Sequence, residues 1–242
     1  MKSLLRRTAD SLLGAIYPPN LYCMACGDAI EPHVRVHALC DVCIAAIDWI
    51  AEDPYEKSPE SFAFDELWSC CRYGAEARAI MNGFKTGAKS YYADALGLLM
   101  AERTLLGCER CGIDPEELQI VSFVPMHPDK QALRGYNQAE LLAEAVCREL
   151  GLKLERKALV KRNLSPSMRF SDGITRRTAL SDAFSQGDSA SEVKGKHVLL
   201  IDDVSTTGST LDACSLVLKQ AGASKITALC FAAVGDYIEN PF

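Results

Sequence analysis

The stretch VLLIDDVSTTGSTLDAC, residues 198–214, decides the fold. An apolar run ends in two adjacent carboxylates, Asp202 and Asp203, and a short loop of serine, threonine and glycine leads into a helical pattern. A short and almost wholly apolar run is typical of a strand that is buried on both faces of a parallel sheet. The stretch therefore predicts a strand, a tight loop and a helix in direct succession.

The loop of this stretch, residues 205–210, is suited to hold a phosphate. The first N–H groups of a helix have no intrahelical partner and lie at the positive end of the helix dipole, so anions dock there. Gly208 allows the backbone to approach closely. Hydroxyl donors are added by Thr206, Thr207, Ser209 and Thr210. The simpler interpretation, a serine or threonine N-cap, explains one hydroxyl but not the two acids before it.

The two carboxylates narrow the choice of ligand. They repel a phosphate, but they accept hydrogen bonds from vicinal hydroxyl groups and hold a hydrated Mg²⁺ through water. A ligand with a phosphate at one end and sugar hydroxyls at the other satisfies both features, which indicates a ribose 5-phosphate. The location agrees, because ligands of open α/β sheets bind beyond the carboxyl ends of the strands.

The rest of the chain alternates strands with helices, which predicts an α/β fold with a parallel sheet flanked by helices. We expect further strands at residues 120–125, 153–160 and 224–234. We expect helices at about residues 75–84, 93–106, 137–150 and 209–223. Residues 62–73 are expected to form a hairpin or an extended pair, and residues 126–133 and 161–184 to form loops.

Two CxxC pairs near the N-terminus, with thirteen residues between them, predict a metal site. Each pair can chelate one ion from a tight knuckle, and two pairs complete a tetrahedron of thiolates without an open position. We therefore expect a structural Zn²⁺ that supplies folding energy to a small module, residues 1–55. Its ligands are Cys23, Cys26, Cys40 and Cys43. The alternatives are a redox pair or buried, unpaired thiols.

A third CxxC, Cys108 and Cys111, has no partner pair. It is an exposed loop pair, a redox switch or a chance spacing, and we expect no second metal there. The odd total of eleven cysteines in a chain of 242 residues favours a reducing cytoplasm over secretion. Residues 1–17 predict an amphipathic helix that ends at the prolines that follow.

Two further features of the composition limit the partners of the protein. The sequence contains no uninterrupted run of about 18 apolar residues, so it predicts no membrane span. The net charge of −6 means that any contact with nucleic acid needs a local basic patch.

Residues 202–210 resemble the signature of type I phosphoribosyltransferases, which bind 5-phosphoribosyl-1-pyrophosphate (PRPP). The matching residues are Asp202, Asp203, Val204, Ser205, Thr206, Thr207, Gly208, Ser209 and Thr210. The resemblance implies that the acid pair orients the ribose as the catalytic pair, that the loop binds the 5-phosphate, and that Mg²⁺ accompanies PRPP. Ser205 departs from the signature, which usually has an aliphatic residue at this position.

The chain as a whole resembles the competence-associated ComF family. The resemblance rests on the paired cysteines, on Lys85-Thr86-Gly87, on the block Arg134-Gly135-Tyr136-Asn137-Gln138 and on the PRPP signature. It implies that residues 124–130 form a pyrophosphate loop and that the basic residues 161–177 form a mobile hood. The side chains expected to neutralise a pyrophosphate are His127, Lys130, Arg134 and Arg176. Without the resemblance, residues 126–133 are equally well interpreted as a surface loop.

The hood departs from the family pattern at two positions. Met168 stands where the family usually has glutamine, and Ala179 stands where an asparagine usually follows the arginine that Arg176 matches. Both departures concern the binding of an acceptor or the closing of the site.

Three functions remain open at this point. The first is a phosphoribosyltransferase, a glycosyltransferase of unknown acceptor, in a domain of residues 56–242. The second is a non-catalytic accessory protein of competence and DNA uptake that binds PRPP and single-stranded DNA or other competence proteins. The third is a PRPP sensor that acts without turnover. Release of pyrophosphate with a panel of acceptors separates the first function from the other two.

Overall fold

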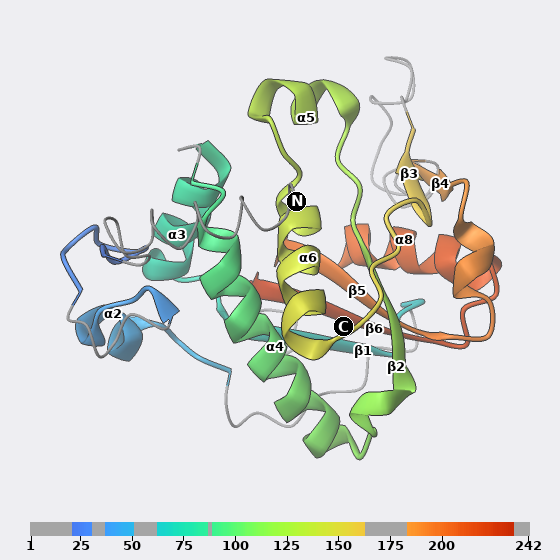
Figure 1. Cartoon of the computed structure of the whole chain (residues 1–242), viewed down its shortest axis with the longest axis horizontal. Helices are drawn as coiled ribbons and strands as arrows, with labels where there is room; N and C mark the ends of the chain where they lie inside the picture. Colours follow the sequence, from blue (N-terminus) through green and yellow to red (C-terminus); the bar gives the residue numbers. More distant parts are fainter. Residues whose placement is uncertain (1–20, 31–36, 51–61, 87–88, 163–182, 235–242) are drawn as a thin grey trace, which may run out of the picture.

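The computed structural model describes residues 21–30, 37–50, 62–86, 89–162 and 183–234 (Figure 1). Two expectations lie outside these residues: the N-terminal helix and most of the hood. Among the described residues, no helix is both long enough and apolar enough to cross a lipid bilayer.

A parallel sheet of four strands forms the centre of the molecule. Its order is β1-β6-β5-β2. The bounds are Glu66–Arg72 for β1, Leu118–Phe123 for β2, His197–Ser205 for β5 and Lys225–Ala233 for β6. The two inner strands, β5 and β6, are buried over most of their length, as their apolar sequences predict. The strands expected at residues 120–125, 197–203 and 224–234 are therefore confirmed.

Helices cover both faces of the sheet. Helices α4 (Tyr92–Cys111) and α6 (Gln138–Leu150) pack against each other and against one face, while α8 (Ser209–Gln220) packs against β5 and β6 on the other (Figure 1). A glycine permits the close contact of α4 with α6, because a Cβ at Gly97 would lie 2.2 Å from the Cβ of Ala145. Helix α3 (Ala75–Thr86) precedes α4. All four expected helices are thus present.

Three local expectations are corrected. Of the two forms expected for residues 62–73, the hairpin is not formed: β1 is an extended strand that pairs in parallel with the distant strand β6 at one edge of the sheet. The strand expected at residues 153–160 is interrupted: Leu154 makes one bridge to β2, and a turn separates it from β3 (Leu159–Lys161), which pairs with β4 (Phe184–Gln186). The expected loop at residues 126–133 contains a short helix, α5 (Pro128–Arg134), because a proline at its first position favours a helix start.

The N-terminal segment contacts β1. Its one described helix is α2 (Asp41–Ala46). The N–H of Ile50 donates to the carbonyl of Cys70, and the N–H of Arg72 donates to the carbonyl of Asp48. Buried residues of this segment belong to the same hydrophobic core as the sheet. Short 3-10 helices at Pro115–Glu117 (η2) and Ala190–Val193 (η4) complete the described elements.

Candidate active site and metal centre

The acid pair lies near the carboxyl end of the central strand β5. Asp202 and Asp203 are both half-buried, and the N–H of Asp203 donates to Oδ1 of Asp202 over 2.8 Å. Burial, followed by the charge of Asp203, raises the pKa of Asp202 to about 8. A lysine from α3 neutralises the second acid: Nζ of Lys85 lies 2.9 Å from Oδ2 of Asp203.

The loop after the acid pair opens helix α8 with a glycine cap. Gly208 adopts the left-handed conformation, with φ 63°, and its carbonyl accepts from the N–H of Asp212. No side chain among the described residues caps this helix end, so its first N–H groups face the loop without a side-chain acceptor. The hydroxyls of Thr207 and Ser209 lie 2.9 Å apart. The arrangement suits an anion at the start of α8.

The hydroxyl-bearing residues of the loop differ in exposure. Thr206 and Thr207 are exposed, and Ser209 and Thr210 are half-buried. Ser205, the departure from the signature, is 3% exposed, and its Oγ has no hydrogen-bond partner in the described part of the chain. Its side chain therefore packs into the core, and its backbone shapes the loop. Val204, the neighbour of the acid pair, is half-buried.

Helix α5 carries the residues expected at a pyrophosphate. Nδ1 of His127 accepts from the N–H of Asp129 over 3.2 Å, which makes this histidine the N-cap of α5. Lys130 is exposed on the same helix. Nη1 of Arg134 donates to Oε1 of Gln138 over 2.6 Å. Lys130 is the most exposed of these cations on α5, and Arg176 lies outside the described residues.

The block at residues 134–138 links three elements through hydrogen bonds. The Tyr136 hydroxyl donates to the carbonyl of Phe84, near the end of α3. Nδ2 of Asn137 donates to the carbonyl of Val124, just after β2, and its Oδ1 caps α6 by accepting from the N–H of Ala139. The block therefore joins α3, the end of β2 and the start of α6 at the edge of the sheet where the acid pair lies.

Two lysines of the site, Lys85 and Lys161, were assigned no individual ligand role from the sequence, although Lys161 is the first residue of the expected hood. Lys85 belongs to the Lys-Thr-Gly run that carried part of the family resemblance, so a signal for it existed. Lys161, on β3, is half-buried with its Nζ 4.9 Å from the centre of the Phe184 ring. Burial lowers its pKa, the charge of Lys130 lowers it further, and Asp202 acts in the opposite direction. Lys161 therefore interacts electrostatically with Asp202, which no motif in the sequence indicates.

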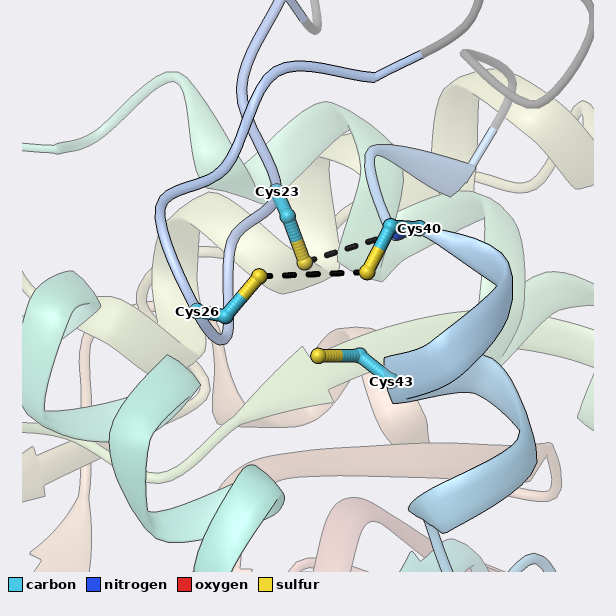
Figure 2. Close-up of side chains that lie close together, drawn as sticks. All are labelled: Cys23, Cys26, Cys40 and Cys43. Carbon is cyan, nitrogen blue, oxygen red and sulfur yellow. Dashed lines mark hydrogen bonds between the residues drawn. The ribbon is translucent and has the colours of Figure 1, made fainter.

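The four cysteines of the N-terminal segment converge on one point (Figure 2). Their sulfur atoms all lie within 4.8 Å of one another. The Sγ atoms of Cys26 and Cys40 are 3.8 Å apart, and the N–H of Cys40 donates to Sγ of Cys23. Gly27, with φ 83°, makes the turn of the first knuckle. Four thiols in this arrangement suit a tetrahedral Zn²⁺.

The thiols of the cluster titrate differently. Burial raises the pKa of Cys23, but backbone N–H donors, including those of Cys26 and Cys40, outweigh it and lower the pKa to about 7. A backbone hydrogen bond at Asp28 lowers the pKa of Cys26, yet burial and the neighbouring thiols bring it to about 11. Burial and the other thiols raise the pKa of Cys43 as well. Only a cation would allow all four groups to ionise together.

The third CxxC does not form an exposed loop pair. Cys108 and Cys111 lie in the last turn of α4, with Cys108 fully buried and Cys111 half-buried. Burial raises the pKa of both thiols. Within the described residues, the N-terminal four-cysteine group is the one cluster of cysteine, histidine and acidic side chains that could hold a metal ion.

Comparison with known proteins defines the class. Residues 137–241 match the phosphoribosyl transferase domain. Among solved structures, the protein TT1426 of Thermus thermophilus aligns over 61% of this chain and 76% of its own, with 20% identity and a TM-score of 0.35. The glutamine PRPP amidotransferase of B. subtilis aligns over 59% of this chain and 26% of its own, with 18% identity and a TM-score of 0.39. The domain match and the helix-flanked parallel sheet define a type I phosphoribosyltransferase fold.

Curated relatives narrow the class. DNA utilization protein YhgH of Escherichia coli K12 is 26% identical over 208 residues, which cover 86% of this chain and 82% of the relative. Competence protein F of Haemophilus influenzae is 36% identical over 103 residues, which cover 43% of this chain and 45% of the relative. Together with the phosphoribosyl transferase domain and the four-cysteine cluster, these relatives fit an assignment of the chain to the ComF family.

Proposed function

We propose that the protein binds PRPP beyond the carboxyl end of β5 and transfers its 5-phosphoribosyl group to an acceptor. One observation carries the proposal: the acid pair Asp202 and Asp203 is followed, after a short loop, by a helix start whose first turn has no side-chain cap among the described residues. Carboxylates accept from ribose hydroxyls, and an uncapped helix start binds phosphate. PRPP presents both groups on one sugar.

The chemistry that follows is a displacement at the anomeric carbon. The acceptor forms a bond to C1 while the bond from C1 to the pyrophosphate oxygen breaks, and the pyrophosphate leaves with the electron pair. Asp202 and Asp203 would hold the ribose hydroxyls, and the backbone of residues 205–210 would hold the 5-phosphate. Mg²⁺, bound with PRPP and reached from the acid pair through water, would offset charge on the leaving group. Positioning and electrostatics therefore supply most of the catalysis.

Two measurements test the proposal. Isothermal titration calorimetry with PRPP and Mg²⁺ should give one site per chain, and ribose 5-phosphate should compete for it. Release of pyrophosphate, measured over a panel of nucleobases and amines, should then separate transfer from binding alone. Absence of PRPP binding to the zinc-loaded protein would remove the proposal. Binding without turnover on any acceptor would favour a PRPP-binding accessory or sensor role.

The second candidate function is accessory work in DNA uptake or use. Relatives carry the names DNA utilization protein and competence protein. The cysteine segment has an exposed aromatic side chain, Tyr22, beside the first knuckle, and an aromatic face of this kind can stack on an unpaired base. The net charge of −6 opposes such binding, so it would depend on local contacts.

Fluorescence anisotropy with a single-stranded oligonucleotide tests this candidate. Binding that weakens steeply with salt, and that Tyr22→Ala reduces further, would support it. Val42→Ala serves as a matched control, because Val42 is also exposed on the same segment but has no aromatic ring. No binding at low salt would exclude the candidate. We assign either function to a reducing cytoplasm, since all eleven cysteines are free thiols.

A further inference from the structure

We propose that Lys85 binds the leaving pyrophosphate of PRPP. This inference rests on the proposed function and deepens it, because it assigns the group of the substrate that a further residue would contact. The observation behind it is the ion pair of Lys85 with Asp203, in which Nζ and Oδ2 lie 2.9 Å apart.

The position of the ammonium group follows from the chemistry of the ligand. If Asp203 accepts from a ribose hydroxyl, any cation within hydrogen-bond distance of the same carboxylate lies beside that sugar. In PRPP the pyrophosphate is attached to C1, and the neighbouring carbon carries the 2-hydroxyl. A lysine bound to the acid that holds the vicinal hydroxyls is therefore close to the leaving group.

The backbone of Lys85 is held in place, while its side chain can rotate. Its backbone lies in the last turn of α3, and the Tyr136 hydroxyl anchors that turn through the carbonyl of Phe84. The Lys85 side chain is 29% exposed and the Asp203 side chain 15% exposed, so the pair is largely shielded but still in contact with solvent. A lysine stem has four carbons and rotates freely, so the ammonium can turn from Asp203 to a phosphate while α3 stays in place.

The charge balance favours this movement. Without ligand, Lys85 offsets one of two adjacent acids. With PRPP bound, the hydroxyls occupy Asp203 and the pyrophosphate brings several negative charges next to it. The ammonium then gains a stronger partner and leaves the carboxylate free to accept from the sugar. Lys130 on α5 is exposed, and Lys161 makes no ion pair with either acid among the described residues, so of these three lysines only Lys85 contacts Asp203 there.

The test compares two ligands that differ only in the pyrophosphate. The affinities of PRPP and of ribose 5-phosphate are measured by calorimetry, with Mg²⁺ present, for the wild type, Lys85→Met and Lys85→Arg. We expect Lys85→Met to weaken PRPP binding at least about tenfold, as the loss of a charge-assisted hydrogen bond would, and to change the affinity for ribose 5-phosphate less than about threefold. Lys85→Arg should restore part of the PRPP affinity. Lys157→Met, a change at an exposed lysine of the connection before β3, serves as the control and should bind both ligands as the wild type does.

The outcomes separate the inference from the proposed function. Equal losses for the two ligands, or no loss for either, would overturn the role of Lys85 while PRPP binding by the wild type stands. A wild type that binds neither ligand would remove the proposed function and the inference together. Lys85→Gln provides a second neutral variant if the methionine variant does not fold, and thermal melting establishes which of them is folded.

Discussion

The four-cysteine cluster draws its sulfur atoms from two knuckles of one short segment, whereas the candidate active site draws on at least five elements. In the cluster, all four sulfur ligands come from the segment between Cys23 and Cys43. At the site, β5 and the start of α8 supply the acids and the loop, and the cations come from α3, α5 and β3. Removing one cysteine therefore disables the whole cluster, but removing one residue of the site should weaken one part of the ligand's binding.

The two regions also differ in what they stabilise. The cysteine segment shares its buried residues with the main core and hydrogen-bonds to β1, so its metal should support folding. The acid pair is the opposite case: burial and the charge of Asp203 disfavour ionisation of Asp202, so an ionised pair reduces the stability of the fold. The comparison predicts that changes in one region lower stability and that changes in the other lower affinity.

The largest effect should follow from removing the metal. Structural Zn²⁺ contributes on the order of 10 kcal/mol of binding free energy in zinc-finger peptides, and this energy is linked to folding. Cys43→Ser should therefore abolish zinc binding and lower the melting temperature by many degrees, measured by atomic absorption and differential scanning calorimetry. Cys111→Ser, at a half-buried cysteine outside the cluster, should keep its zinc. A zinc-free Cys43→Ser protein with the wild-type melting temperature would contradict the claim that the metal supports folding.

The next largest effect should be on affinity. Asp203→Asn keeps the shape of the side chain but loses its charge, so hydrogen bonds to ribose hydroxyls weaken by about 1.5–3 kcal/mol, or roughly 10- to 150-fold in affinity for PRPP. The ion pair with Lys85 is partly exposed, so its loss should change the free energy of unfolding by no more than about 1 kcal/mol. Calorimetric titration and urea denaturation measure the two quantities. Unchanged PRPP affinity, or loss of zinc from this variant, would contradict the division between the regions.

The sequence predicted those parts of the molecule that lie in one continuous stretch. The strand, loop and helix at residues 198–214 form as expected, because an apolar run, an acid pair and a glycine-capped helix start are local features. The cysteine cluster could be predicted for the same reason, since ligand spacing alone determines which sulfur atoms can meet.

The parts that could not be predicted depend on long-range packing. Lys85 and Asp203 are far apart in the chain and meet only because α3 ends at the carboxyl edge of the sheet. The sequence of residues 62–73 allows a hairpin or an extended pair because such residues fit any extended partner, and only the pairing of β1 with β6 decides the topology. The interaction of Lys161 with Asp202 depends on the antiparallel pair β3 and β4, whose strands of three residues carry no periodic signal.

The acid pair should make stability depend on pH in an unusual direction. In the unfolded chain Asp202 loses its proton near its ordinary pKa of 3.8, but in the folded chain it keeps the proton up to about pH 8. Between these values the unfolded state binds fewer protons, so the free energy of unfolding contributed by this group falls as pH rises, and it levels off above the folded pKa. Urea denaturation between pH 5 and pH 8.5 should show this fall in the wild type but not in Asp202→Asn.

The difference in stability between the wild type and Asp202→Asn separates the titration of Asp202 from that of the groups around it. The groups that face it are Asp203, Lys85, Lys161, Cys214 and Cys230. His197, at the other end of β5, acts in the opposite direction, because burial lowers its pKa to about 4 and stability is lost as pH falls from 6.5 toward that value. This contribution is the same in both proteins and cancels in the difference. A difference that stays constant with pH would show that Asp202 is ionised in the folded state at neutral pH.

The smallest effect should come from the block that joins the elements of the site. Tyr136→Phe removes only the hydroxyl that donates to the carbonyl of Phe84, and the ring keeps its contact with the Phe84 side chain, 5.9 Å between centroids. A single neutral hydrogen bond contributes about 1 kcal/mol, so stability should fall by about that amount. Because this bond anchors the turn that carries Lys85, PRPP affinity should also fall a few-fold, while ribose 5-phosphate affinity stays unchanged. Tyr91→Phe, at an exposed tyrosine before α4, should change neither quantity. Equal losses for the two ligands in Tyr136→Phe would mean that the block supports the whole site rather than its cationic half.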